Sequence, residues 1–304
     1  MRLIFAGTPE VAAVSLRKLA GRHDVALVIT RPDAPTGRKK VITPSPVALE
    51  AKQLDLPVLK AARIGEVELA AIESADADLG VVVAYGALLN QAALDQLDWW
   101  NLHFSLLPSW RGATPLQHSI WHAQGQGISV FRLDAGMDTG DILCALPLTH
   151  PQDSTAGELL PQLADQGSDL ILELLENLPQ GMAQSGTPSF APKLTRKDAR
   201  LDFGETAELN ARKVMALNPE PMAWTEIRGE PIRIVRARGV GSVDWSSLDE
   251  TVSPLGSVQQ SGESVLVTCG EGTRLQLIEV QPGGKRVMTG MEWFRGLQGS
   301  VVLD

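Results

Sequence analysis

Short apolar stretches alternate with amphipathic helical patterns over roughly the first 180 residues of the chain. Strands that alternate with helices usually pair in parallel, because each helix carries the chain back to the same edge of the sheet. This alternation predicts an α/β domain with a mostly parallel sheet. The expected strands are Leu3–Ala6, Val25–Thr30, Leu79–Ala84, Leu102–Phe104 and Ile128–Leu133.

The remainder of the chain has a different pattern. Gln184–Pro192 is rich in Ser, Gly, Thr and Pro, which is typical of a linker. Beyond it come short β-rich runs such as Ser264–Thr268 and Arg274–Val280. A small OB-like β-barrel suits such short strands, because closure of the sheet removes unpaired edges. We therefore predict an N-terminal domain over 1–183, a linker over 184–203 and a barrel over 204–304.

The composition is that of a globular protein in water. Hydrophobic residues make up 44% of the chain and charged residues 21%, and no apolar run is long enough to span a bilayer. The apolar N-terminal stretch is too short for a signal peptide. Cys144 and Cys269 are far apart and lack a CxxC pair or a His cluster, which argues against a disulfide scaffold and a zinc site. We expect a cytoplasmic protein with no metal and no membrane partner.

The net charge of −9 argues against indiscriminate binding of nucleic acid, which needs local positive potential. Two basic runs, Arg31–Lys40 and Lys193–Arg200, could still supply such potential. Taken alone, each run is more often a solvated face than a binding site.

Three residues have side chains suited to acyl transfer. Asn101 and His103 are two residues apart on a predicted strand, so their side chains point to the same side. The Asn amide could donate to a developing oxyanion, and a His imidazolium could add a donor or protonate a leaving nitrogen. Asp138 comes one helix and one strand later, a spacing that predicts a neighbouring parallel strand end, and could orient the imidazole and raise its pKa.

Purely structural roles also fit these residue types. Asn and His at a strand end are commonly capping groups or satisfied core groups. Trp99 and Trp100, just before Asn101, are better explained by core packing than by base stacking. The chain has no GxGxxG, P-loop, HExxH or GxSxG motif, which argues against dinucleotide-binding enzymes, P-loop NTPases, zinc proteases and α/β-hydrolases.

The chain contains these further motifs: Phe5–Glu10, Val82–Gly86, Asn101–His103, Ser105–Pro108, Trp110–Ala113, Met137–Asp141, Ala191–Leu194, Asn218–Pro219 with Pro221, and Gln281–Lys285. Together they resemble the motifs of the methionyl-tRNA formyltransferases. The Asn, His, Ser-Leu-Leu-Pro and Asp elements are shared by the wider group of 10-formyltetrahydrofolate-dependent transferases, and the other motifs are typical of the tRNA enzymes. The resemblance implies a formyltransferase-type Rossmann-like domain followed by a tRNA-binding barrel.

The resemblance also implies an activity and a set of site residues. The formyl group of 10-formyltetrahydrofolate would pass to the α-amine of methionyl initiator tRNA, for translation initiation, in a monomeric enzyme without a metal. Asn101, His103 and Asp138 would be catalytic, and a base for the attacking amine beyond His103 or water is left open. The folate portion of the donor would contact Ser105, Leu106, Leu107 and Pro108. The tRNA would contact Arg38, Lys39, Lys40, Lys193, Arg196 and Lys197.

The chain departs from the family pattern at two positions. Phe104 replaces a small residue between the His and the Ser, and Ala34 stands where the family's basic loop often carries Arg. The barrel has more acidic than basic residues, so it would need a local basic face to bind RNA. Residues proposed for such a face are Arg233, Arg236, Arg238, Lys285 and Arg286.

Two alternative functions fit part of the pattern. A folate-dependent formyltransferase with a small acceptor, such as a glycinamide ribonucleotide or an amino sugar, would share the three catalytic residues without needing the basic loop. An RNA-binding protein that has lost catalysis would keep the basic runs, but the presence of all three catalytic residue types argues against it.

Overall fold

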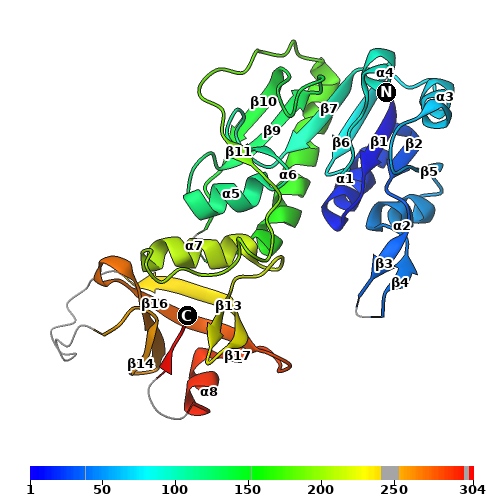
Figure 1. Cartoon of the computed structure of the whole chain (residues 1–304). Coiled ribbons are helices and arrows are strands. Elements are labelled where there is room, and N and C mark those ends of the chain that lie inside the picture. The colour runs from blue at the N-terminus through cyan, green and yellow to red at the C-terminus, as the bar shows by residue number, and fades with distance from the viewer. Residues whose placement is uncertain (38, 152, 241–252, 298–300) are drawn as a thin grey trace. The chain divides into compact units, whose positions relative to one another are not determined.

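The computed structural model describes residues 1–37, 39–151, 153–240, 253–297 and 301–304. The chain folds into two compact units (Figure 1). The first comprises Met1–Pro115, Gly125–Thr149 and Leu160–Pro192. The second comprises Leu116–Gln124, His150–Leu159 and Lys193–Asp304, so it includes two segments from within the predicted N-terminal domain.

A seven-stranded sheet forms the centre of the first unit, in the order β10-β9-β7-β6-β1-β2-β5. The five strands from β5 to β7 pair in parallel, which confirms the predicted sheet type. Bounds of the strands are β1 Arg2–Gly7, β2 Asp24–Thr30, β5 Val58–Lys60, β6 Leu79–Val83, β7 Trp99–His103, β9 Gly127–Arg132 and β10 Ile142–Pro147.

The edge of the sheet beyond β7 is antiparallel. Strand β9 pairs antiparallel with β7, with Trp100 opposite Arg132 and His103 opposite Ser129. Strand β10 pairs antiparallel with β9. The expectation that Asp138 follows a strand parallel to β7 is therefore wrong, and the end of β9 lies beside the start of β7.

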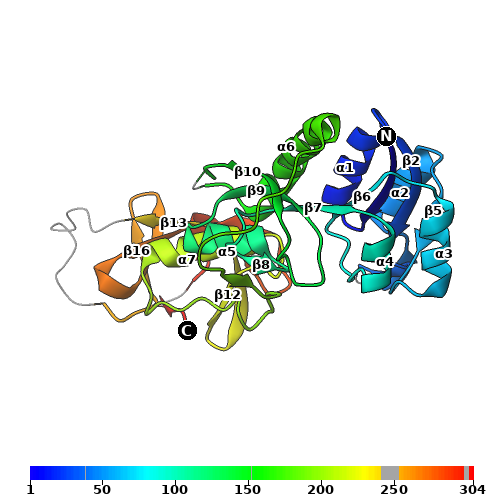
Figure 2. The ribbon, with the colours of Figure 1, turned by 90° about the horizontal axis from the view of Figure 1, so that it is seen from above.

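Helices cover both faces of this sheet (Figure 2). On one face, Ile72 of α3 and Ala93 of α4 pack in a core with Ile4 and Ile29 from the strands. On the other, α1 lies beside α6, and Lys18 of α1 forms ion pairs with two Asp side chains of α6. Bounds of the helices are α1 Glu10–Ala20, α2 Pro46–Gln53, α3 Glu66–Ser74, α4 Gln91–Gln96 and α6 Ala156–Asn177.

Two small sheets extend the first unit. The basic run Arg31–Lys40 contributes to a hairpin of β3 (Ala34–Thr36) and β4 (Val41–Thr43). Strand β8 (Arg111–Gly112) pairs in parallel with β11 (Phe190–Ala191), which lies inside the predicted linker.

The second unit contains an antiparallel sheet in the order β12-β13-β16-β15-β14-β18, with β17 paired to β16. A bridge between Ile227 and Leu303 joins the two ends, so the sheet forms a nearly closed barrel, as predicted. Bounds are α5 Pro115–His122, α7 Ala207–Leu217, β12 Trp224–Ile227, β13 Glu230–Val240, β14 Ser257–Ser261, β15 Ser264–Thr268, η1 Gly270–Gly272, β16 Arg274–Pro282, β17 Met288–Thr289, α8 Gly290–Arg295 and β18 Val301–Val302.

Among the helices in the described ranges, none has both the length and the apolar character that crossing a membrane requires.

Candidate functional site

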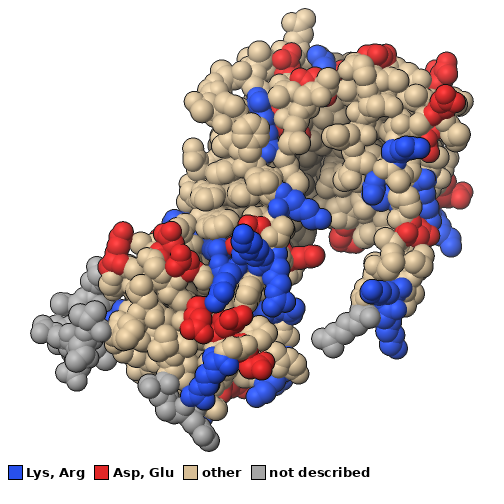
Figure 3. Space-filling view, in the orientation of Figure 1, with Lys and Arg blue, Asp and Glu red and all other residues tan. Residues whose placement is uncertain are grey.

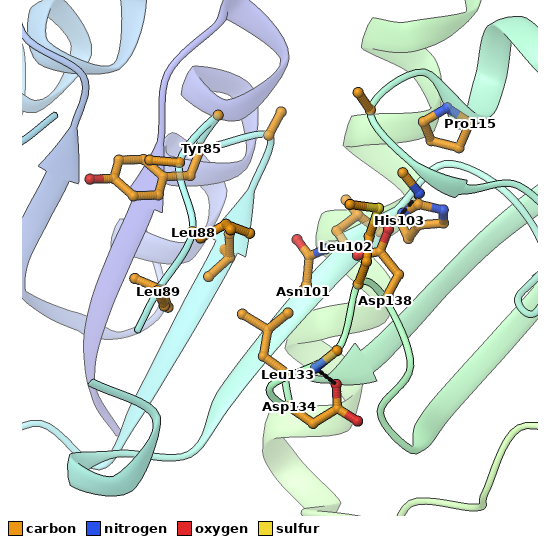
Figure 4. Close-up of a pocket in the computed structure, with 18 of the residues that line it drawn as sticks. Tyr85, Leu88, Leu89, Asn101, Leu102, His103, Pro115, Leu133, Asp134 and Asp138 are labelled. Carbon is orange, nitrogen blue, oxygen red and sulfur yellow. Dashed lines mark hydrogen bonds and ion pairs between the residues drawn. The ribbon is translucent and has the colours of Figure 1, made fainter. Parts of the chain in front are cut away.

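A cavity of about 570 Å³ lies in the first unit where β6 and β7 end (Figure 4). Ligands of α/β proteins commonly bind at the carboxyl ends of parallel strands, and this volume is typical of small-molecule sites. Its lining comes from the end of β6 and the loop after it, the end of β7, the turn after β8, and the loop after β9.

Asn101, His103 and Asp138 all line this cavity, and their side chains lie next to one another in Figure 4. Asn101 and His103 are on β7 and face the cavity together, as the alternation of a strand predicts. The structure therefore brings together the three residues that the sequence singled out for chemistry.

His103 is 4% exposed, and each ring nitrogen has a different neighbour. Nε2 lies 2.9 Å from the carbonyl oxygen of Trp110. Because a carbonyl oxygen can only accept, Nε2 carries a proton and donates it to this bond. Nδ1 lies 3.8 Å from Oδ2 of Asp138, so in the neutral ring Nδ1 is the unprotonated nitrogen.

Burial and charge act in opposite directions on this imidazole. Burial lowers the pKa of His103, while the Asp138 carboxylate and the Trp110 carbonyl raise it. Burial is the larger effect, so the pKa lies below its ordinary value of about 6.5. At neutral pH, His103 is therefore a neutral imidazole with Nδ1 available to accept a proton.

Asp138 reaches His103 through a loop that folds back after β9. Asp134 starts this fold, because its Oδ1 accepts hydrogen bonds from the Gly136 amide at 3.0 Å and the Thr139 hydroxyl at 2.6 Å. Asp138 itself has a left-handed φ of 53°, and its Oδ2 accepts from the Gly112 amide at 2.7 Å. Asp138 therefore lies near His103 although β9 runs antiparallel to β7, and not parallel to it as the spacing predicted.

The predicted folate-contacting motif Ser105–Pro108 is not among the residues lining the cavity. The Ser105 hydroxyl donates to the Ser109 carbonyl at 2.7 Å, and the Leu107 amide donates to the Ser129 hydroxyl at 3.0 Å. These bonds brace the turn after β7 against β9. Contact between this motif and a folate stays a prediction.

Sequence reasoning missed the apolar residues that line the cavity after β6 and β9. Tyr85, Leu88 and Leu89 follow β6, and Leu133 follows β9 (Figure 4). Leu88 is 83% exposed at the cavity, so it is free to pack against a ligand. The motif Val82–Gly86 could have pointed to the residues after β6, because it lies at the end of the strand next to β7. Such a wall suits a flat, largely apolar molecule, and Phe104, also buried, adds to it.

The basic residues predicted to contact tRNA are exposed where the structure describes them. Lys39 and Lys40 lie at the β3–β4 hairpin of the first unit, and Arg38 lies outside the described residues. Lys193, Arg196 and Lys197 are exposed in the second unit. Figure 3 shows Lys and Arg side chains gathered on one face of that unit.

Several barrel arginines are already paired with acidic side chains. Arg236 forms an ion pair with Glu158 at 2.6 Å, and Arg238 with Asp153 at 2.9 Å. These partners reduce the positive potential that the two arginines offer to phosphate. By contrast, the Arg196 guanidinium lies 4.7 Å above the ring of Trp224, a contact that orients the cation without neutralising it.

Comparisons with known proteins identify the family of the chain. The family model described as formyl transferase matches residues 1–175, and that of the formyl transferase C-terminal domain matches 193–298. A methionyl-tRNA formyltransferase of Leifsonia xyli subsp. xyli is 44% identical over the full length of both chains. One of Acidothermus cellulolyticus is 43% identical over 97% of each chain.

Solved structures with the same fold include an N-formyltransferase from Helicobacter canadensis in complex with folinic acid and dTDP-3-aminofucose. It has a TM-score of 0.65 and 16% identity, and the match covers 92% of this chain and 98% of that one. A methionyl-tRNA formyltransferase from Clostridium thermocellum has a TM-score of 0.57 and 16% identity, covering 78% of this chain and 93% of that one. From the two family models and the full-length relatives together, the chain belongs to the formyl transferase family.

Proposed function

We propose that this chain transfers the formyl group of 10-formyltetrahydrofolate to the α-amine of methionyl initiator tRNA. The observation that carries the proposal is the set of Asn101, His103 and Asp138 at one cavity with an apolar wall. Full-length relatives named methionyl-tRNA formyltransferase support the choice of acceptor.

The proposed reaction needs one charge stabilised and one proton moved. The amine nitrogen forms a bond to the formyl carbon, and the bond from that carbon to N10 of the folate breaks. The amine nitrogen therefore loses a proton and N10 gains one. Meanwhile the formyl oxygen becomes more negative in the transition state, which calls for a hydrogen-bond donor.

Asn101 supplies that donor in the proposed mechanism. Its side chain is carried by a strand in the interior of the sheet, so the Asn101 backbone is held in place before the substrates bind. Loss of one such donor in other acyl-transfer enzymes costs about 10²–10³ in rate.

His103 moves the proton in the proposed mechanism. Its unprotonated Nδ1 accepts the proton of the attacking amine, and the resulting imidazolium passes it to the departing N10. Asp138, 3.8 Å away, stabilises the imidazolium while it exists. This gives the attacking amine a side-chain base, the role that sequence reasoning left open.

The acceptor RNA is held by phosphate contacts from exposed lysines and arginines in this proposal. In the first unit these are Lys39 and Lys40, and we expect Arg38, which precedes them in sequence, to act with them. In the second unit they are Lys193, Arg196 and Lys197. An acceptor of this kind places the enzyme in the cytoplasm, and we expect it to act as a monomer.

The test is single-turnover transfer of labelled formyl from 10-formyltetrahydrofolate to methionylated initiator and elongator tRNAs. A dTDP-linked amino sugar serves as a small acceptor in parallel. We expect transfer to initiator tRNA in strong preference to both others. Efficient transfer to the amino sugar, with none to either tRNA, would replace this proposal by the small-acceptor alternative.

The variant His103→Ala tests the catalytic assignment. We expect it to lose turnover and to bind initiator tRNA with unchanged affinity, because His103 is buried while the residues proposed to contact tRNA are exposed. Turnover at the wild-type rate would rule out the role given to this residue.

A further inference from the structure

The segment 181–192, here called the strap, follows α6 and runs along both loops of the site. Met182 and Ile142 exchange two backbone hydrogen bonds of 2.9 and 2.8 Å, which fixes the strap beside the end of the Asp138 loop. Further along, Ala191 pairs with Gly112 in the β8–β11 ladder. Residues 184–192 of the strap belong to the predicted linker, and the strap contacts both the end of the Asp138 loop and strand β8.

Gln184 lies between these two anchor points and uses every hydrogen-bonding position of its amide. Its Nε2 donates to the carbonyl oxygens of Asp138 and Gly140, both at 2.8 Å. Its Oε1 accepts from Nη2 and Nε of Arg111 at 2.6 and 3.2 Å. The amide can face only one way, because Arg111 can only donate and the two carbonyls can only accept.

This arrangement connects the two sides of the Asp138 carboxylate. Asp138 has a left-handed backbone, a conformation that persists only where surrounding contacts hold it. Gln184 holds its carbonyl, and Gly112, next to Arg111 on β8, holds its carboxylate at 2.7 Å. The Gln184 side-chain amide therefore links the backbone of the Asp138 loop to β8, the strand whose Gly112 amide donates to the Asp138 carboxylate.

We infer that Gln184 is a positioning residue: it fixes the Asp138 loop against Arg111 and so sets the separation between the Asp138 carboxylate and His103. The inference rests on the proposed function, in which Asp138 stabilises the His103 imidazolium. Gln184 itself does not line the cavity, so it acts through Asp138.

Two near-isosteric variants separate positioning from simple stability. Gln184→Met removes all four hydrogen bonds. Gln184→Glu keeps an acceptor for Arg111 but cannot donate to the two carbonyls. We expect kcat to fall about 10- to 100-fold in both variants, because a small displacement of a catalytic group has that effect, with KM for both substrates within about threefold. Gln91→Met, at an exposed amide of α4 that donates to Asp95, is the matched control.

A second readout does not depend on which acceptor the enzyme uses. Among the described residues, Asp138 is the charged group that acts on His103, and the neighbours of the His103 ring include the Trp110 carbonyl and the Phe131 ring. Weaker positioning of Asp138 in Gln184→Met should lower the pKa of His103, as measured by NMR in the substrate-free protein. The proposed function can fail while this shift is still seen, so the two failures are distinguishable.

The inference is overturned by any of three results. The first is a kcat within twofold of wild type in Gln184→Glu, because donation to the carbonyls would then be dispensable. The second is an unchanged His103 titration in Gln184→Met. The third is a lowered melting temperature accompanied by a rise in KM that accounts for the loss, because Gln184 would then serve stability alone.

Discussion

Replacing Asp138 by Asn removes the charge beside His103 while keeping the size of the side chain. The Asn oxygen can still accept the Gly112 amide, so the geometry of the loop should persist. What disappears is the attraction between the carboxylate and an imidazolium whose Nδ1 lies 3.8 Å away. In the proposed mechanism this attraction exists only after His103 has taken the proton, so its loss raises the barrier.

The size of the effect can be worked from this distance. Two unit charges 3.8 Å apart at an effective dielectric of about 20 attract each other by about 4 kcal/mol. The Asp138 side chain is 15% exposed, so solvent screens part of this, and about 2 to 4 kcal/mol is a reasonable range. Because about 1.4 kcal/mol corresponds to tenfold in rate, kcat should fall between about 30-fold and about 10³-fold.

The assay is single-turnover formyl transfer at saturating substrate concentrations from pH 5 to 8, with the titration of His103 followed by NMR. The Asn variant should have a slower plateau, and the pKa of His103 should fall further because the raising effect of Asp138 is gone. Asp141→Asn, in the same loop segment but outside the cavity, is the charge-matched control. A rate within threefold of wild type with an unchanged titration would refute the reasoning.

Three further outcomes are expected. Burial lowers the pKa of His103 and His150, so near pH 6 the unfolded chain binds more protons than the folded protein does. The free energy of unfolding, measured in urea, should therefore stay constant above about pH 6.5 and decrease as the pH falls. An increase in this free energy on acidification would contradict the argument. Gly112→Ala, at a φ of 126° and with the new Cβ 2.7 Å from the Ala191 carbonyl, should cost about 1–3 kcal/mol of stability in urea and slow transfer. Arg196→Ala should reduce the salt dependence of tRNA binding by about one counterion, and Arg238→Ala, already paired, by less; equal slopes would disprove the distinction.

The parts of the fold that follow from local periodicity could be predicted from the sequence. The parallel strands of the first unit and the short strands of the barrel leave clear patterns, because side chains alternate between two faces. The same rule placed Asn101 and His103 on one face of β7. Resemblance to a known family then supplied the chemistry that periodicity alone could not.

The direction of a strand, unlike the alternation of its side chains, leaves no pattern in the sequence. Strand β9 has the same apolar content whether it runs parallel or antiparallel to β7, so the position of Asp138 could not follow from spacing. Its approach to His103 depends on the turn that Asp134 begins, which is a side-chain interaction within the loop. Asp138 was singled out from its spacing and from the resemblance to a known family, and the path of its loop to His103 is visible only in the structure.

Contacts between distant segments were the hardest to predict. The strap has the composition of a linker. Its contacts could not be predicted because its hydrogen bonds use Gln, Ser and backbone groups, which are equally common in loops. In the barrel, Arg236 and Arg238 looked available for RNA, and their partners Glu158 and Asp153 lie 78 and 85 residues away in sequence. Charge counted along a chain does not show which charges are already paired.

The separation of 3.8 Å between His103 and Asp138 suits a base that must begin neutral. A carboxylate at direct hydrogen-bond distance would favour the imidazolium more strongly and oppose the effect of burial, leaving less free base at neutral pH. Here Oδ2 of Asp138 is engaged by the Gly112 amide, and burial outweighs the carboxylate, so His103 starts neutral. Once the ring accepts a proton, the same carboxylate is close enough to stabilise it. The Gly112 amide and Gln184, which hold Asp138 at this distance, therefore matter to the proposed chemistry as much as the carboxylate does.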